Sequence, residues 1–373
     1  MPEDHPEPER SIRQAIAERG PVSFAEFMEL ALYGPGGFYE EPPVGERGHF
    51  VTSPHVHEVF GTLLAEAVRE CWGHVGDPGA MAVVEVGAGD GTLAGRVRAE
   101  LEAVPVEYTV VERSPGARRV LEKAEPPLRV AASLEALDHH VEGVILANEL
   151  LDNLPFRWVR RTDGGNLLEV LVDADREDRL VPLERPFPED DRDALEAVPE
   201  PFPPGTDAVV PEGALRFVER LARVLHRGYA ILIDYAAAPG AEMHGYRSQR
   251  VVEDVLERPG SADITAGVDF QALSGRAEAL GLRSFQPVTQ RSALRALGFD
   301  RWNERERSKQ AEAQDRRSGR EAVEAWSGRN AAAELVDEGG LGRLRWWVLA
   351  TPEMPEPDWV ALANRLDLAE IPG

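Results

Sequence analysis

Two carboxylates lie three residues apart in the stretch ANELLDNLP, residues 147–155. Glu149 and Asp152 directly follow the apolar run 144–147, which is typical of a buried strand. In an open α/β sheet the carboxyl ends of the strands form the ligand crevice. Two carboxylates on one side of a turn would suit a guanidinium, which presents a planar fork of N–H donors. Asn and Asp also cap helices and form turns, so a purely structural role is the alternative interpretation.

A glycine-rich turn is the second stretch that could do chemistry. Residues 81–92 read MAVVEVGAGDGT, an apolar run followed by glycines at 87, 89 and 91. Glycine permits a sharp turn and lets a ligand lie against bare main chain. Strand, glycine turn and helix form the nucleotide-binding start of many open α/β sheets. The dinucleotide pattern G-x-G-x-x-G would need glycine where Thr92 stands, which disfavours a dehydrogenase; a glycine turn with only a structural role remains an alternative.

Two acidic residues accompany the glycine turn and indicate an adenosine ligand. Glu85 precedes Gly87 by two residues, and Glu112 ends the next expected strand, 107–112. A carboxylate at that strand end can accept both hydroxyls of a ribose. The pattern E-x-G-x-G-x-G resembles motif I of the class I S-adenosylmethionine (SAM) methyltransferases. SAM has no pyrophosphate, so no phosphate site at a helix terminus is required.

The elements that must position these residues alternate between strand and helix. This alternation predicts an α/β fold with a doubly wound, mostly parallel, Rossmann-like sheet and right-handed crossovers. A capping box formed by Ser23 and Glu26 opens a helix in the segment before the sheet, and Ser53-Pro54 opens another. The expected strands are 81–86, 107–112, 129–131, 143–148, 157–161, 167–173, 229–234, 283–286 and 343–350. The expected helices are 11–19, 23–33, 53–72, 91–102, 115–123, 134–140, 212–225, 270–280 and 291–297.

These patterns divide the chain into three parts. Residues 1–78 form an N-terminal helical preface, 79–350 form the α/β domain, and 351–373 form a C-terminal tail. Within the domain, residues 174–206 are acidic and proline-rich with little periodicity, which predicts a surface insertion. Residues 304–337 are highly charged and helix-prone, which predicts a solvated face.

Composition narrows the possible partners and compartment. The formal net charge of −25 argues against a nucleic-acid-binding surface, which should be basic. A cationic partner is easier to accommodate. The alternative is that the charge serves solubility alone. No apolar run approaches the roughly 18 residues of a membrane span, so no membrane partner is expected. The acidic, proline-rich start MPEDHPEPER resembles no targeting segment, and a cytoplasmic protein is the expectation.

Metal and other catalytic motifs are not recognisable. The single cysteine, Cys71, excludes an internal disulfide and cysteine-clustered metal sites. Neither the pair His55 and His57 nor the pair His139 and His140 has the i, i+4 spacing of helical metal ligands, so no catalytic metal is expected. The chain has no G-x-S-x-G elbow and no P-loop, which disfavours hydrolases and kinases.

Several blocks in order resemble the MidA-like SAM-dependent methyltransferases, the family that includes the mitochondrial complex I assembly factor that methylates an arginine. The resemblance runs from about Ser23 to Gly298. It is carried by the stretches SFAEFMELALYGPGGFY, FVTSP, VFGTLLAE, VVEVGAGDGTL, ILANELLDNLPFR, ILIDYA, YRSQRVVEDVL, DITAGVDF and TQRSALRALG.

This resemblance implies a class I methyltransferase fold for residues 79–350, SAM as the cofactor, and specific site residues. The implied cofactor set is Glu85, Gly87, Gly89, Gly91 and Glu112, with Thr52, Ser53 and Pro54 closing over SAM from the helical preface. The implied catalytic set, facing the substrate, is Asn148, Glu149, Asp152 and Asn153. In the characterised eukaryotic member the substrate is a protein arginine in a complex I subunit.

Three positions depart from the family pattern in stretches expected near the site. His49 stands where the family usually has Asp, His55 where it commonly has Glu, and Gly267 replaces a histidine. These changes affect substrate identity more than SAM binding. We therefore predict a methyltransferase acting on a protein side chain, an arginine guanidinium, within a cationic segment. The alternatives are a methyltransferase for a small molecule or other nucleophile, and a SAM-binding assembly factor or chaperone with little turnover.

Overall fold

An eight-stranded mixed sheet forms the centre of the protein. The computed structural model describes residues 6–40, 52–76, 79–137, 140–200, 202–237, 243–247, 250–316 and 318–370. The strand order is β14-β16-β10-β5-β2-β3-β4, with β15 also paired to β16, and β10, β5, β2, β3 and β4 run parallel. The strands are β2 (Met81–Val86), β3 (Val106–Val111), β4 (Arg129–Ala131), β5 (Val141–Asn148), β10 (Leu225–Asp234), β14 (Arg283–Ser284), β15 (Val288–Thr289) and β16 (Arg345–Ala350). The expected doubly wound, mostly parallel sheet is confirmed.

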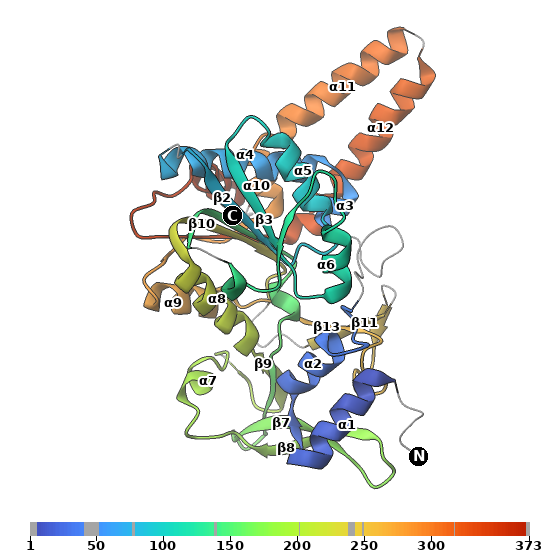
Figure 1. Ribbon diagram of the computed structural model, residues 1–373, viewed down its shortest axis with the longest axis vertical. Helices are drawn as coiled ribbons and strands as arrows, with labels where there is room; N and C mark the ends of the chain where they lie inside the picture. Colours follow the sequence, from blue (N-terminus) through green and yellow to red (C-terminus); the bar gives the residue numbers. More distant parts are fainter. Residues whose placement is uncertain are drawn as a thin grey trace.

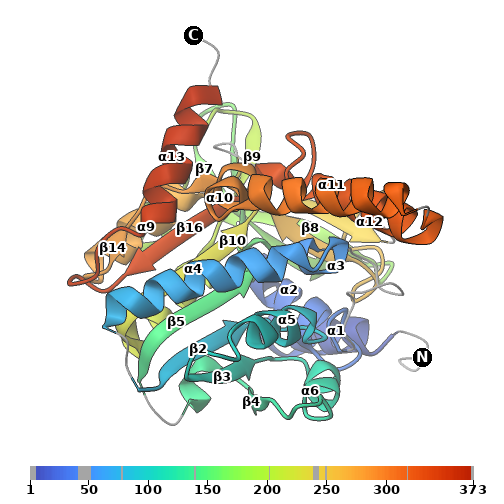
Figure 2. The same cartoon turned by 90° about the horizontal axis from the view of Figure 1, so that it is seen from above.

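Helices cover both faces of this sheet, so its central strands are apolar runs buried on both sides. One face packs against helices that lie together in Figure 2, and the other packs against α8 and α9. The first set is α4 (Val59–Val75), α5 (Thr92–Glu100), α10 (Gln290–Ala296) and α13 (Asp358–Glu370), and the second is α8 (Glu212–Val224) and α9 (Phe270–Ala279). A shorter helix, α6 (Pro115–Leu121), connects β3 to β4.

The order in which the chain adds strands to the central sheet reverses between β2 and β5, although these two strands are parallel. From β2 it proceeds outward to β3 and β4, then returns to β5 on the other side of β2. Such a topological switch point opens a crevice beyond the carboxyl ends of the two strands. Gly87 follows β2 there, and Glu149 follows β5. The two stretches that we singled out from the sequence are therefore neighbours in space.

A second, antiparallel sheet lies in the lower half of Figure 1 and packs against α1 (Glu7–Arg19) and α2 (Phe24–Tyr33). Its strands are β1 (Val22–Ser23), β6 (Arg157–Arg161), β7 (Leu167–Ala174), β8 (Leu180–Pro186) and β9 (Thr206–Val210). The stretch 174–206, expected as a surface insertion, contributes β8 and α7 (Arg192–Glu196), and it buries Phe187 and Phe202. Its sequence shows little periodicity because most side chains of the edge strand β8 are exposed or only partly buried.

Three short strands form a further sheet that the sequence patterns did not predict. They are β12 (Arg250–Val252), β11 (Met243–Arg247) and β13 (Asp263–Ala266), in that spatial order. β13 packs against the short helical turn η2 (Leu151–Asn153), which follows β5. This sheet therefore brings the DITAGVDF stretch to the switch point.

The C-terminal third contains a helical hairpin, the strand β16 and a final helix. The charged stretch 304–337 falls in a helical hairpin, α11 (Phe299–Asp315) and α12 (Gly319–Glu334), which projects from the body in Figure 1 as expected for a solvated face. The expected C-terminal tail contains α13, whose Trp359 and Val360 are buried in the main core. The expected helix 134–140 is only a short turn, η1 (Leu134–Ala136). The division of the chain into three parts stays a prediction. No helix in the described ranges is long and apolar enough to cross a membrane.

Candidate active site

A cavity of about 1300 Å³ opens at the switch point between β2 and β5. Its walls come from the ends of the parallel strands, from α3 (Ser53–Val56), and from β11 and β13. Most of the site residues expected from the sequence line it: Thr52, Pro54, Glu85, Gly87, Gly89, Glu112, Asn148, Glu149, Asp152 and Asn153. Ser53 and Gly91 lie behind this lining and support it.

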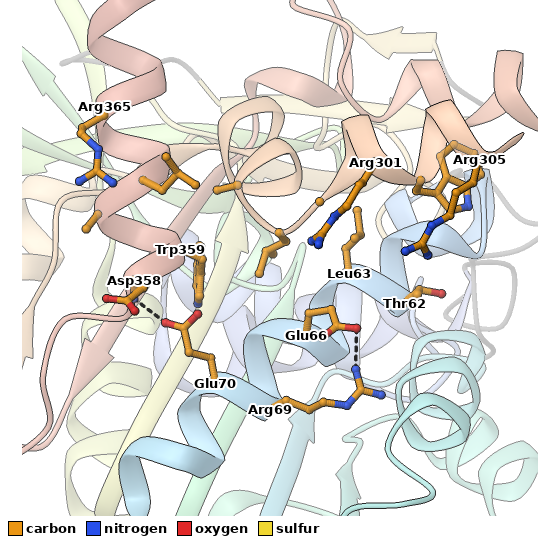
Figure 3. A pocket seen from close by; sticks show the side chains of 16 residues that line it. Thr62, Leu63, Glu66, Arg69, Glu70, Arg301, Arg305, Asp358, Trp359 and Arg365 are labelled. Atoms are coloured by element: carbon orange, nitrogen blue, oxygen red, sulfur yellow. Dashed lines mark hydrogen bonds and ion pairs between the residues drawn. The ribbon is translucent and has the colours of Figure 1, made fainter. Parts of the chain in front are cut away.

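A second cavity, of about 890 Å³, lies between α4, α11 and α13 and contains none of the expected residues (Figure 3). Its carboxylates are largely engaged in structure: Glu66 pairs with Arg69 at 2.7 Å, and Glu70 accepts the backbone N–H of Asp358 at 2.5 Å. The groups able to do chemistry therefore gather in the first cavity.

The glycine turn lies against both the crevice and the protein interior. Gly87, Gly89 and Gly91 have φ values of +75°, +56° and +83°, a region that side chains disfavour. A Cβ on Gly87 would lie 3.1 Å from Cδ1 of Leu150, and a Cβ on Gly91 would lie 2.8 Å from Cδ2 of Leu121. Gly87 and Gly89 thus present bare main chain to the cavity, whereas Gly91 begins α5 and maintains the turn.

Glu112 ends β3 beside this turn and has the geometry expected of a ribose acceptor. Its Oε2 accepts the N–H of Gly89 at 2.9 Å, and its Oε1 accepts the N–H of Ser114 at 2.8 Å. Each carboxylate oxygen keeps a further lone pair that a hydroxyl can use. Burial raises the pKa of Glu112, although these backbone hydrogen bonds oppose the rise.

Glu85, on β2, is more deeply buried, with 3% of its surface exposed. The hydroxyl of Tyr108 donates to its Oε2 at 2.5 Å. Burial raises the pKa of Glu85 to about 8, even though the bond from Tyr108 favours the ionised form. The carboxyl can therefore be protonated at neutral pH. Because Glu85 lines the cavity, a cationic ligand bound there would favour its ionised form.

Glu149 follows β5 in a left-handed backbone conformation, with φ of +52°. Its N–H donates to the carbonyl of Ile233 at 2.7 Å, and its Oε1 accepts the N–H of Ser53 and the Nδ2 of Asn148, both at 3.1 Å. A non-glycine residue held in this conformation by hydrogen bonds is a feature typical of functional sites. Burial raises the pKa of Glu149 to about 7.

Asp234, at the end of β10, holds this turn in place, a role that we did not assign from the sequence. Its Oδ2 accepts the N–H groups of Leu150, Leu151 and Asp152 at 3.0, 2.6 and 3.3 Å, and its Oδ1 accepts that of Tyr235 at 2.8 Å. The side chain is fully buried. The signal was present in ILIDYA, where one carboxylate ends an otherwise apolar strand.

Asp152 and Asn148 each carry a buried oxygen that lacks a partner. Neither Oδ1 accepts a hydrogen bond from any described residue. Burial, together with the nearby charges of Asp234 and Asp263, raises the pKa of Asp152 well above its usual value. Within the described ranges, no arginine or lysine forms an ion pair with Glu149 or Asp152. Unpaired buried oxygens are expensive, so they indicate a ligand that donates hydrogen bonds or carries positive charge.

Two tyrosines and a third buried acid complete the cavity, and sequence reasoning missed all three. The hydroxyl of Tyr33 donates to Oδ1 of Asn153 at 3.2 Å, and the Nδ2 of Asn153 donates to the hydroxyl of Tyr39 at 2.7 Å. The hydroxyl of Tyr39 in turn donates to Oδ1 of Asp263 at 2.8 Å. The expected residue Asn153 is therefore a hub that joins α2 and β13 to the turn after β5.

The positions that depart from the family pattern are adapted to their surroundings. The Nε2 of His55 lies 3.0 Å from Oδ2 of Asp90, and its Nδ1 lies 2.9 Å from Oγ1 of Thr52, so His55 ties α3 to the glycine turn. A Cβ on Gly267 would lie 2.7 Å from the Cα of Ala237, so this backbone has no room for a histidine. His49 lies outside the described residues.

Metal ligation is not indicated where the structure can be assessed. His139 lies outside the described residues, and the described ones contain no group of three or more His, Cys, Asp or Glu side chains that could hold a metal ion.

Comparisons with known proteins agree with this geometry. The family Methyltransf_28, described as "Putative S-adenosyl-L-methionine-dependent methyltransferase", matches residues 63–288. Protein arginine methyltransferase NDUFAF7, mitochondrial, of Danio rerio is 30% identical over 336 residues, covering 78% of this chain and 76% of the relative. Its Homo sapiens counterpart is 29% identical over 339 residues, covering 78% and 73%. A crystal structure from Burkholderia thailandensis, bound to S-adenosyl-homocysteine, is similar with a TM-score of 0.80 at 26% identity, covering 95% of this chain and 94% of that one.

Proposed function

The chain belongs to the Methyltransf_28 family of SAM-dependent methyltransferases, and on this basis we propose that it methylates a guanidinium nitrogen of a protein arginine. The observation that carries the proposal is the pair Glu149 and Asp152, buried in the cavity with no ion pair to an arginine or lysine among the described residues. A guanidinium supplies both the positive charge and the planar donors that such a pair lacks. The names of the relatives, protein arginine methyltransferases, support the same substrate.

The cavity fits SAM at its glycine-turn end. We propose that Gly87 and Gly89 lie against the cofactor and that Glu112 accepts its ribose hydroxyls through the lone pairs left free by Gly89 and Ser114. In this proposal Thr52 and Pro54 of the α3 segment cover the cofactor, while Ser53 and Gly91 hold the surrounding backbone. Glu85 lies within reach of the same end of the cavity.

The work left to the protein is orientation and charge stabilisation. SAM, when bound, supplies a methyl group that is already activated on a sulfonium. An arginine side chain is protonated near neutral pH, so its nitrogen must be held in line while a positive charge persists beside it. Asp152 and Glu149 would orient that nitrogen and stabilise the charge. Oε2 of Glu149 is the acceptor for the departing proton, because Oε1 already accepts two hydrogen bonds.

Identification of the labelled residue tests this proposal. The purified protein would be incubated with tritiated SAM and host-cell extract, and the labelled proteins hydrolysed for amino-acid analysis. We expect methylarginine, and we expect its formation to fall sharply in the Glu149→Gln and Asp152→Asn variants. Label in a small molecule or on another residue would contradict the arginine assignment. Tight SAM binding without label would favour an assembly factor.

The compartment is a separate proposal. We propose a cytoplasmic location, whereas the names of the relatives carry the word mitochondrial. Fractionation of cells that express the full chain, followed by immunodetection, distinguishes the two.

A further inference from the structure

Asp263 is a buried carboxyl that lines the cavity but belongs neither to the glycine turn nor to the turn after β5. It begins β13, in the small sheet β12-β11-β13, and only 4% of its surface is exposed. It lines the same cavity as Glu149 and Asp152. These three acids, two from the turn after β5 and one from β13, thus line one cavity.

The hydrogen bonds of Asp263 use only one of its oxygens. Oδ1 accepts both the hydroxyl of Tyr39, at 2.8 Å, and the N–H of Ile264, at 3.0 Å. Oδ2 has no hydrogen bond or ion pair with any residue in the described ranges. Because Asp263 lines the cavity, the free lone pairs of Oδ2 can accept hydrogen bonds from a ligand there.

Tyr39 fixes the position of Asp263 relative to the turn after β5. The hydroxyl of Tyr39 gives its proton to Asp263, so it can accept the Nδ2 of Asn153, which it does at 2.7 Å. Asn153 is the neighbour of Asp152, whose own Oδ1 is buried without a partner. Tyr39 is also stacked on Tyr33, with ring centroids 5.3 Å apart and planes 16° apart. The hydrogen bonds from Asn153 to Tyr39 and from Tyr39 to Asp263 therefore hold Asp152 and Asp263 near each other in the cavity.

We propose that Asp263 is a specificity-determining residue that, together with Asp152, holds the methyl acceptor as a planar guanidinium cation, and that Tyr39 is its positioning residue. The assignment of a guanidinium rests on the proposed function. A guanidinium carries five N–H donors in one plane, more than a single carboxyl can accept. Two carboxyls that line one cavity can share them.

Small guanidinium compounds test this without knowledge of the natural substrate. Protein loaded with S-adenosyl-homocysteine would be titrated calorimetrically with n-propylguanidinium chloride and with the neutral, similarly shaped n-propylurea. We expect the wild-type protein to prefer the guanidinium at least tenfold. Asp263→Asn should remove at least tenfold of guanidinium affinity and change urea affinity less than twofold. Asp263→Glu should restore part of the preference, and Tyr39→Phe should reduce it about threefold.

The controls separate loss of charge from loss of structure. The exposed Asp190→Asn should behave as wild type, and every variant should keep its affinity for S-adenosyl-homocysteine within twofold. A guanidinium preference in Asp263→Asn equal to that of the wild type would overturn the inference, as would a wild-type protein that does not distinguish the two compounds. Methylarginine in the tritium experiment with no effect of Asp263→Asn would refute this inference alone. Absence of methylarginine would refute the proposed function, whatever the guanidinium titrations give.

Discussion

Glu149→Gln should produce a protein that is more stable and almost inactive. The glutamine Oε1 can still accept the N–H of Ser53 and the Nδ2 of Asn148, so the turn after β5 keeps its hydrogen bonds. What is lost is the charge and the proposed proton acceptor Oε2, which an NH2 donor replaces. The substitution therefore separates the electrostatic role of this side chain from its structural one.

The stability gain follows from the raised pKa. Burial raises the pKa of Glu149 from its usual 4.5 to about 7. Ionisation of this carboxyl therefore costs the folded state free energy at pH values above 4.5, and the cost approaches its limit above about pH 7. The limit is about 3 kcal/mol, so Glu149→Gln should be more stable than wild type by up to about that amount at pH 8, and by less than about 1 kcal/mol at pH 5. In a chain of this size the gain at pH 8 corresponds to about 5 °C in melting temperature.

The activity loss follows from the missing charge beside the acceptor. Removal of one group that stabilises charge in the transition state typically lowers kcat by about 10²–10³-fold. Single-turnover assays with tritiated SAM at pH 8 measure this loss, and calorimetry should give unchanged SAM affinity. The wild-type rate should also rise with pH through about 7 as the carboxyl ionises. Glu189→Gln, on an exposed loop, is the matched control. A variant that stays active, or one whose stability gain does not shrink at pH 5, would refute the reasoning.

Three further substitutions test other parts of the site. Gly89→Val places a branched side chain at φ +56° on the cavity wall and should weaken SAM binding at least about 100-fold by calorimetry. The control Gly73→Val, in open space on α4, should leave SAM affinity unchanged. Normal affinity in Gly89→Val would mean that the turn does not contact SAM. Asp234→Ala leaves four N–H groups, one buried and three part-buried, without their acceptor. At about 1 kcal/mol per bond the variant should lose several kcal/mol of stability, with a lower melting temperature and a lower kcat; wild-type kcat in a folded variant would contradict its positioning role. Tyr108→Phe removes the one side-chain donor that Glu85 has among the described residues. It should destabilise the protein by about 1–3 kcal/mol in urea unfolding at pH 9, with a smaller effect at pH 6, where Glu85 is protonated; an equal loss at both pH values would indicate a packing defect instead.

The central sheet could be predicted from the sequence because parallel strands are buried on both faces. The apolar run 81–86 matches β2 residue for residue, and the glycine turn and the acidic turn after β5 mark the strand ends that form the crevice. The second sheet was only partly predicted, since its edge strand β8 exposes most of its side chains and leaves no alternating pattern.

The missing parts of the site come from segments that are distant in sequence. Tyr39 lies just after α2 and Asp263 begins β13, yet they share a hydrogen bond across 224 positions. Neither stretch has a spacing that indicates chemistry, and only the packing of the three-stranded sheet against η2 brings Asp263 to Asn153. Asp234 was visible as a carboxylate at a strand end, but its role depends on a turn that reaches back to it from β5.

The segment containing α3 contacts both the glycine turn and Glu149, so under the proposed function cofactor exchange and acceptor binding are thermodynamically linked. His55 contacts Asp90 in the glycine turn, while the N–H of Ser53 donates to Glu149, which we propose lies beside the acceptor. A movement of α3 that let S-adenosyl-homocysteine leave would also take a hydrogen bond from Glu149 and favour its protonated form. The carboxyl would then hold an acceptor cation less tightly. By reciprocity, an acceptor that binds ionised Glu149 favours the closed position of α3 and so strengthens cofactor binding.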